Sequence, residues 1–225
     1  MYKKLLDQFF NENTVEGELP SVQGFAYYQI MFERNQELNK ILQGIFNENF
    51  PKPQPGREEN FQAEKNEIGS ATSCEQIIRL MRRGIDNLNY RTITSKALEF
   101  EDEIIPEIMR RLKTSLNISF IELSIRILSK TSMDIADELI GYFDDVRDLY
   151  AKSMILVALG FLANETHISW LIEKYKELIK QYPDKSYCEG AYYALYEIDR
   201  KMHSSGQKHW DSIRDWQWCN KVFGP

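Results

Sequence analysis

The sequence VRDLYAKSMILVALGFL, at residues 146–162, decides how we interpret the rest of the chain. After Asp148, Lys152 is the one charged residue within this apolar stretch. A helix that is apolar on nearly every side needs packing neighbours on nearly every side. We therefore predict that these residues form the central helix of a packed helical array.

The composition is that of an ordinary globular protein. Of the 225 residues, 43% are hydrophobic and 28% are charged, which is enough for one domain, or one domain with an appendage. The net charge of −6 disfavours nucleic-acid binding, because affinity for phosphate depends on clustered Lys and Arg.

Cysteine usage and hydropathy bear on where the protein works. Cys74, Cys188 and Cys219 are odd in number and widely spaced, so they indicate neither a disulfide framework nor a zinc site. The sequence shows no secretory leader and no apolar run long enough to span a membrane. We expect a cytoplasmic protein with no membrane contact.

The first third of the chain is less regular than the rest. Residues 1–50 are expected to form an N-terminal helical pair. Residues 51–72 contain three alternating prolines and then mostly polar residues, so we predict a mobile, polar, Pro-containing loop. We also expect the segment after this loop to fold without residues 1–50.

From residue 73 to residue 202 helical patterns follow one another. Ser73 with Gln76, and Ser119 with Glu122, fit capping boxes at helix starts. Ile105, Ile135 and Ile168 occupy equivalent positions at a spacing of 30 to 33 residues. In each pair the first helix has one apolar face and the second is apolar on two sides, as stacked helical hairpins require.

The motifs of this region resemble a known repeat type. Val146-Arg147 followed by Ala151 and Ala158-Leu159-Gly160 resembles the second helix of a HEAT repeat, and residues 104–108, around a proline, resemble the first helix. Residues 187–198 are similar to a degenerate second helix. The resemblance implies an all-α fold, an α-solenoid of stacked helical hairpins over residues 73–202, and it implies no activity. Armadillo-like and other irregular helical arrays remain open.

Residues 203–225 hold three of the four tryptophans. Trp210, Ile213 and Trp216 have helical spacing, which favours a Trp-rich C-terminal cap over the open end of the array. The alternative is an anchor for a partner, because Trp is enriched in binding hot spots.

The sequence offers little catalytic chemistry. His167, His203 and His209 fit neither a nucleophile–base pair nor a metal-ligand spacing, so we predict no catalytic residue, no cofactor and no metal. Basic residues occur in two modest groups. They are Arg79, Arg82, Arg83 and Arg91, and then Arg110, Arg111 and Lys113.

These observations favour a non-enzymatic protein-interaction module. The net acidity favours a basic partner, which an immunity or antidote protein or a regulatory adaptor would bind. The alternative is a nucleic-acid enzyme on a HEAT-like scaffold, such as a DNA glycosylase. The residues we expect to bind the partner are aromatic or charged and lie on second helices or in the tail. They are Arg126, Lys152, Glu189, Tyr192, Tyr193, Tyr196, Trp210 and Trp216.

Overall fold

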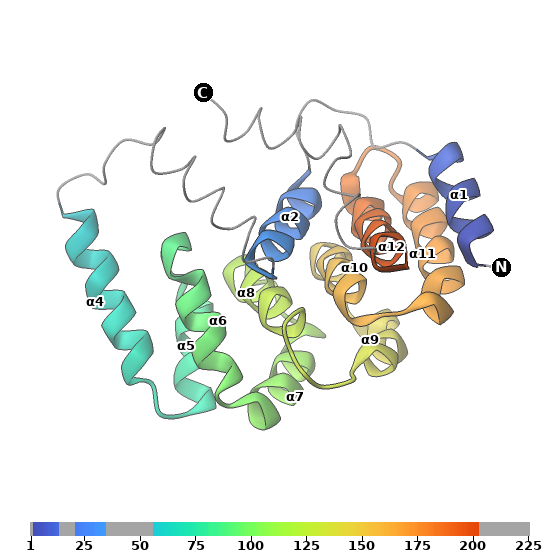
Figure 1. Cartoon of the computed structure of the whole chain (residues 1–225). Coiled ribbons are helices and arrows are strands. Elements are labelled where there is room, and N and C mark those ends of the chain that lie inside the picture. Colours follow the sequence, from blue (N-terminus) through green and yellow to red (C-terminus); the bar gives the residue numbers. More distant parts are fainter. Residues whose placement is uncertain (1, 14–20, 35–55, 203–225) are drawn as a thin grey trace. The chain divides into compact units, whose positions relative to one another are not determined.

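A computed structural model describes residues 2–13, 21–34 and 56–202 of the chain. These residues form eleven α-helices and no strand, which confirms the all-α class (Figure 1). The helices are α1 (Tyr2–Glu12), α2 (Val22–Arg34), α4 (Arg57–Ser70), α5 (Cys74–Arg83), α6 (Tyr90–Leu98), α7 (Glu101–Leu112), α8 (Ile118–Leu128), α9 (Ala136–Tyr142), α10 (Leu149–Leu162), α11 (Ile168–Gln181) and α12 (Glu189–Met202).

The chain divides into two compact units. Unit 1 comprises residues 1–51 and 163–225, and unit 2 comprises residues 52–162. This division differs from the predicted one, which separated an N-terminal pair at residues 1–50 from a continuous array at residues 73–202. In unit 1 the N-terminal helices α1 and α2 pack with α11 and α12, so the two ends of the chain build one structure.

Unit 2 is built around α8 and α10. The predicted all-round burial of α10 is confirmed, since Ala151 and residues 153–161 are all buried while Lys152 is partly exposed. Helix α8 contacts α5, α6, α7 and α10. The aligned residues Ile105, Ile135 and Ile168 are all buried, as their spacing predicts.

The helix starts differ from the predicted capping boxes. The Ser73 side chain does accept from the backbone N–H of Gln76, but the Gln76 side chain accepts from the N–H of Thr72 rather than from that of Ser73. The N-cap of α8 is Asn117, whose Oδ1 accepts from the Phe120 N–H at 2.7 Å. Ser119 therefore lies inside the first turn of α8 and does not cap it.

The predicted loop is wrong over residues 57–70, which form α4, while residues 51–55 lie outside the described part. The helix is polar and is held largely by side chains of unit 2. Glu64 accepts from Asn89 Nδ2 at 2.7 Å and from the Asp86 N–H at 2.9 Å. Ile68 is fully buried. Sequence patterning missed this helix because it carries so few apolar residues.

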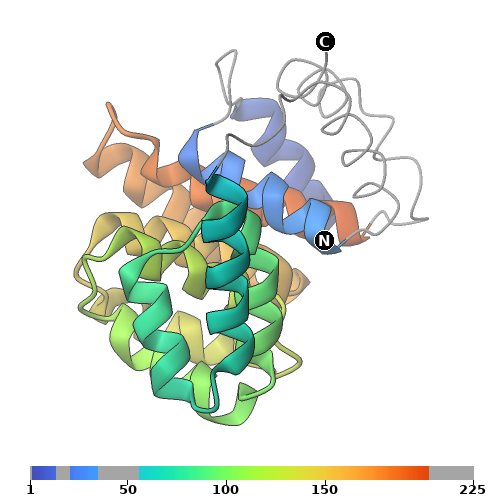
Figure 2. The ribbon, with the colours of Figure 1, turned by 90° about the vertical axis from the view of Figure 1, so that its left-hand side faces the viewer.

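Figure 2 shows α4 at the near edge of unit 2. It contacts α6 and the 3-10 turn η1 (Asn87–Asn89). The face of α5 beside it is therefore partly open, and this leaves a hollow between the two helices.

Unit 1 is organised around α12. This helix contacts α11, α2 and α1, and α1 also contacts α11 (Figure 1). The small residues Gly190, Ala191 and Ala194 of α12 are buried, and they let its neighbours approach closely.

Candidate functional site

The tyrosines of α12 were predicted to face a partner, but they form an internal interface. Tyr192 and Tyr193 are 4% and 2% exposed, and Tyr196 is half-buried. The Phe10 ring of α1 lies 5.4 Å from the Tyr192 ring, edge to face. The Tyr27 ring of α2 stacks on the Tyr193 ring at 5.2 Å. Since α1 and α2 cover these side chains, this conformation does not offer Tyr192 and Tyr193 to a partner.

A polar group locks α2 onto α12 beside the aromatic contacts. Tyr27 donates its hydroxyl proton to Glu197 Oε2 at 2.9 Å, and Arg200 donates from Nε and Nη2 to the same carboxylate at 2.7 and 2.6 Å. Glu197 is 1% exposed. Burial and the nearby Glu197 charge raise the pKa of Tyr27 well above its ordinary value. Glu189 likewise accepts a hydrogen bond from the hydroxyl of Ser21, the residue before α2.

The other predicted site residues do not gather on one exposed surface. Arg126 is 5% exposed, with its guanidinium 4.8 Å from the centre of the Tyr90 ring. Lys152 Nζ lies 3.4 Å from the Asp144 carbonyl oxygen and 5.3 Å from the centre of the Phe143 ring. Trp210 and Trp216 lie outside the described residues. A binding role for these residues stays a prediction.

The structure instead brings Arg82 of the first basic group to the same hollow as Arg110 and Arg111 of the second. Helices α5 and α7 are in contact in unit 2, and each carries two arginines in its last turn. Asn117 joins this region to α8, because its Nδ2 donates to the Arg82 carbonyl oxygen at 2.9 Å. Cations at helix C-termini are stabilised by the helix dipole, which explains their position without any function.

A hollow of about 590 Å³ lies between these helix ends. We call it the arginine hollow. It is lined by Arg82, Arg110, Arg111, Thr114, Ser115, Leu116, Asn117 and Phe120. The lining combines three guanidinium groups with hydroxyls and with apolar surface.

The arginines of the hollow differ in how far they are neutralised. Arg110 and Arg111 share the Glu107 carboxylate, and Arg111 also reaches Glu75 at 2.9 Å. Hydrogen bonds from Arg110, and then from Arg111, lower the pKa of Glu107 to about 2. Arg82 is exposed, and its side chain pairs with no carboxylate among the described residues.

Two exposed apolar side chains flank Asn117, which lines the hollow. Leu116 is 75% exposed and Ile118 is 61% exposed, one on either side of Asn117. The helical pattern of the sequence suggests that both side chains are buried, but both point outward where α7 ends and α8 begins. Large apolar side chains that remain exposed beside polar groups are typical of binding surfaces.

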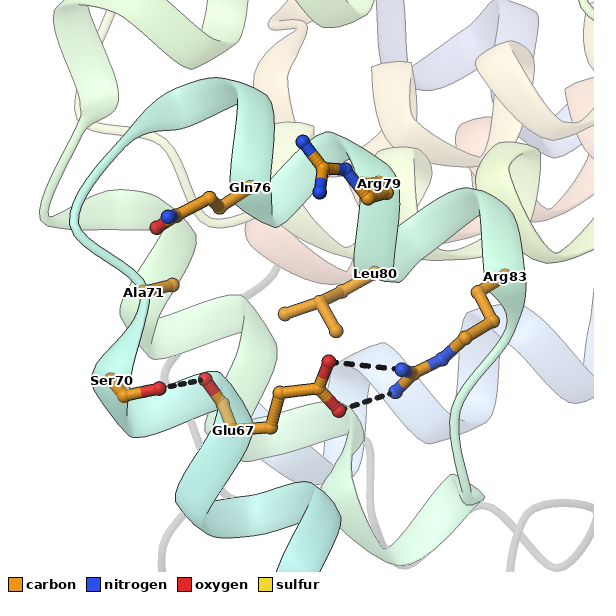
Figure 3. A pocket seen from close by; sticks show the side chains of 7 residues that line it. All are labelled: Glu67, Ser70, Ala71, Gln76, Arg79, Leu80 and Arg83. Atoms are coloured by element: carbon orange, nitrogen blue, oxygen red, sulfur yellow. Dashed lines mark hydrogen bonds and ion pairs between the residues drawn. The ribbon is translucent and has the colours of Figure 1, made fainter.

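A smaller hollow of about 220 Å³ lies between α5 and α4 (Figure 3). Its rim holds the ion pair between Arg83 and Glu67, in which Nη1 and Nη2 each lie 2.9 Å from one carboxylate oxygen. Arg79 also lines this hollow, and Figure 3 shows no interaction between it and the residues drawn there. Arginines of α5 therefore line two hollows.

The described residues hold no group of three or more His, Cys, Asp or Glu side chains placed to bind a metal ion. His167 helps to cap a helix, because its Nδ1 accepts from the Asn164 N–H at 3.2 Å. Burial raises the pKa of the Cys188 thiol to about 11, which keeps it protonated near neutral pH. Within the described ranges, no helix has the length and apolar character needed to cross a membrane.

Comparisons with protein-family models, with curated proteins and with solved structures give no significant match to this chain. The class that fold and site define is therefore an all-helical protein with an arginine-lined surface hollow. Its relationship to HEAT repeats stays a prediction from motifs.

The sequence contained a signal for the arginine hollow. Arg82-Arg83 and Arg110-Arg111 each lie in the last turn of an amphipathic helix. Two helices that pack side by side and run in the same direction bring such ends together. The exposure of Leu116 and Ile118 could not be predicted from the sequence, because it depends on the residue at which α7 ends.

Proposed function

We propose that this protein is a non-enzymatic protein-interaction module that docks an acidic, partly apolar segment of a partner at the arginine hollow. One observation carries the proposal. Arg82, whose guanidinium pairs with no carboxylate in the part of the chain that the structure describes, lines the same hollow as Leu116, whose side chain is 75% exposed. A segment with carboxylates beside a bulky apolar residue would complement both.

The charge of the hollow changes our expectation of the partner. The net charge of −6 favours attraction to a basic protein at long range. Contact, however, depends on local complementarity, and the local charges here are guanidinium groups. We therefore propose an acidic docking segment, which a regulatory adaptor or an immunity-type protein could equally bind.

The scaffold that we propose is the HEAT-like array of helical hairpins that the motifs imply. Consecutive hairpins of such an array would pack α5 against α7, and residues of both helices line the hollow. The free thiols of Cys74 and Cys188 suit a reducing compartment such as the cytoplasm, where we place the protein.

A nucleic-acid enzyme is the less well-supported alternative. Glu75 and Glu107 pair with Arg110 and Arg111 and so interrupt the run of free positive charge that a phosphate backbone needs, and exposed aliphatic side chains add little affinity for one. A base-flipping enzyme would also need a continuous basic track along the duplex, whereas this surface is mixed in sign.

Site-specific photo-crosslinking in the source cells tests the proposal. A photo-reactive residue in place of Leu116 should crosslink to an acidic segment of one protein, and Arg82→Glu should abolish the product. The matched control is the same residue in place of Leu88, which is 52% exposed in unit 2 but does not line the hollow.

Two results would overturn the hypothesis of a protein-interaction module. One is the same mixture of crosslinked products from both positions. The other is a gel shift with duplex DNA at physiological salt that weakens steeply as salt is added, which would favour the nucleic-acid alternative.

A further inference from the structure

Two arginines of α5 stand out because the carboxylates around them are already engaged. Arg79 and Arg82 are exposed, and neither side chain pairs with a carboxylate among the described residues. Their neighbour Arg83 is held by Glu67 through two hydrogen bonds of 2.9 Å. Figure 3 shows this pair and shows Arg79 apart from it.

Glu75 is the acid that helical spacing would assign to Arg79. It lies four residues before Arg79, the arrangement that favours an ion pair on a helix. Its carboxylate instead accepts from Arg111 of α7 at 2.9 Å. The packing of α7 on α5 thus takes away the intrahelical partner and leaves Arg79 with its full charge.

Arg79 and Arg82 are three residues apart within α5, so they lie on neighbouring turns, with Cβ atoms roughly 5–6 Å apart. Two like charges at this separation repel each other, and a group carrying two negative charges relieves the repulsion. A carboxylate supplies one charge. A phosphate monoester supplies nearly two at neutral pH, together with three strong acceptor oxygens that suit guanidinium groups.

We propose that Arg79 and Arg82 form a two-arginine clamp for a phosphorylated side chain in the docking segment. The inference rests on the proposed function, since the phosphate would belong to the segment bound at the arginine hollow. Arg82 lines that hollow, and Arg79 lines the smaller one beside it. The segment would cross α5 with its phosphate above the two arginines and its apolar residue at Leu116.

The first test uses phenyl phosphate as the probe and the arginine Nε–Hε resonances of the full chain as the readout. Titration at pH 7.5 and constant ionic strength should shift Arg79 and Arg82 together along one saturating curve. Either Arg79→Gln or Arg82→Gln should weaken binding about tenfold. Lowering the pH to 5 should also weaken it, because the second pKa of a phosphate monoester is about 6.

Arg147 is the matched internal control. It is exposed and its side chain is unpaired among the described residues, but it lies in the loop before α10, with no second unpaired arginine one turn away. Equal shifts at Arg147, or equal affinity for acetate and phenyl phosphate, would overturn the clamp and leave general attraction to anions.

Failure of the clamp can be told apart from failure of the proposed function. If the photo-crosslink from position 116 forms equally well after phosphatase treatment and with Arg79→Gln, the docking function stands and the phosphate inference is wrong. If no crosslink forms but phenyl phosphate binds at Arg79 and Arg82, the clamp stands and the docking site is wrong.

Discussion

Helix α12 in unit 1 and helix α5 in unit 2 differ in what the rest of the chain does to them. α12 carries the tyrosines that suggest a binding surface, yet α1 and α2 cover them with their own aromatic rings. α5 carries arginines that suggest an ordinary solvated face, and two hollows open beside them. Whether a surface is available to a partner thus depends on distant segments of the chain more than on the helix itself.

The difference has a physical origin. Aromatic rings gain from burial and from edge-to-face contacts, so another part of the same chain can cover them at a gain of about 0.5–1.5 kcal/mol per pair beyond the area buried. Guanidinium groups lose hydration when they are covered, so they stay exposed unless carboxylates accompany them. Aromatic density is therefore a weaker sign of an external partner than unpaired charge beside exposed apolar residues.

Removing the cover from α12 should have the largest effect. Deletion of residues 1–50 takes away α1 and α2, which exposes Tyr192 and Tyr193 and leaves Glu197 without Tyr27. We expect α11 and α12 to lose their packing, contrary to the expectation from sequence that residues 73–225 fold alone. Hydrogen exchange should show lost amide protection over residues 168–202, with protection kept over residues 101–162. Unchanged protection over residues 168–202 would show that α12 needs no cover.

A charge placed in the core of unit 2 should have the next largest effect. Ala158 is fully buried in α10, so Ala158→Asp should reduce the free energy of unfolding by more than about 4 kcal/mol. The matched control is Lys152→Glu, which changes charge at the one partly exposed position between Ala151 and Phe161 of the same helix. It should cost less than about 1 kcal/mol in urea denaturation. A large loss with Lys152→Glu would mean that this side chain is structural.

The polar lock under α2 offers a third comparison. Glu197→Ala removes the acceptor of both Tyr27 and Arg200 and should cost about 3 kcal/mol, because it leaves a partly buried cation without its partner. Tyr27→Phe removes one hydrogen bond and should cost about 1 kcal/mol. Thermal denaturation of the two variants would measure the loss of stability caused by each change. Equal losses would mean that the Glu197–Arg200 pair contributes nothing beyond the tyrosine bond.

These cases show how much could be predicted from sequence. The helical class and the burial of α10 could be predicted from periodicity, because a helix with apolar residues on all sides must be surrounded by packing neighbours. Helix α4 did not follow, since polar contacts to Asn89 and Arg83 hold it. The cover over Tyr192 and Tyr193 could not be predicted either, because it joins residues more than 150 positions apart. For the arginine hollow, the sequence revealed the two separate basic groups but not that residues of both line one hollow.

Close approach of α2 to α12 can be tested with a glycine pair. A Cβ on Gly24 would lie 2.4 Å from the Tyr193 hydroxyl oxygen, and Tyr193 is buried and cannot swing away. Gly24→Ala should therefore cost about 1–2 kcal/mol, although alanine favours the helix by about 1 kcal/mol. Gly69→Ala in α4 meets no atom within 4 Å and should stabilise by about 0.5 kcal/mol. Stabilisation by both changes in thermal melts would show that α2 packs loosely.

The smallest effect on stability is expected at the arginine hollow. Glu107→Gln keeps the shape of the side chain and removes the charge shared by Arg110 and Arg111. Arg110 is largely exposed, so solvent screens the pair and the loss at pH 7 should stay below about 1 kcal/mol. The same change should strengthen phenyl phosphate binding about twofold, because it raises the positive potential of the hollow.

The pH dependence gives this last prediction its sign. The Glu107 pKa falls from 4.5 to about 2 in the folded protein, chiefly through the hydrogen bond from Arg110. A carboxylate with a lowered folded pKa stabilises the fold above its ordinary pKa, and that contribution disappears as the pH falls from 4.5 towards 2. In urea denaturation at pH 6 the free energy of unfolding should therefore be larger for the wild type than for Glu107→Gln. The difference should disappear by about pH 2. A gap that persists at pH 2 would mean that Glu107 acts by packing. Arg110 and Arg111 would then be held by packing, as the tyrosines of α12 are. The difference in availability to a partner between the arginine hollow and α12 would then be smaller.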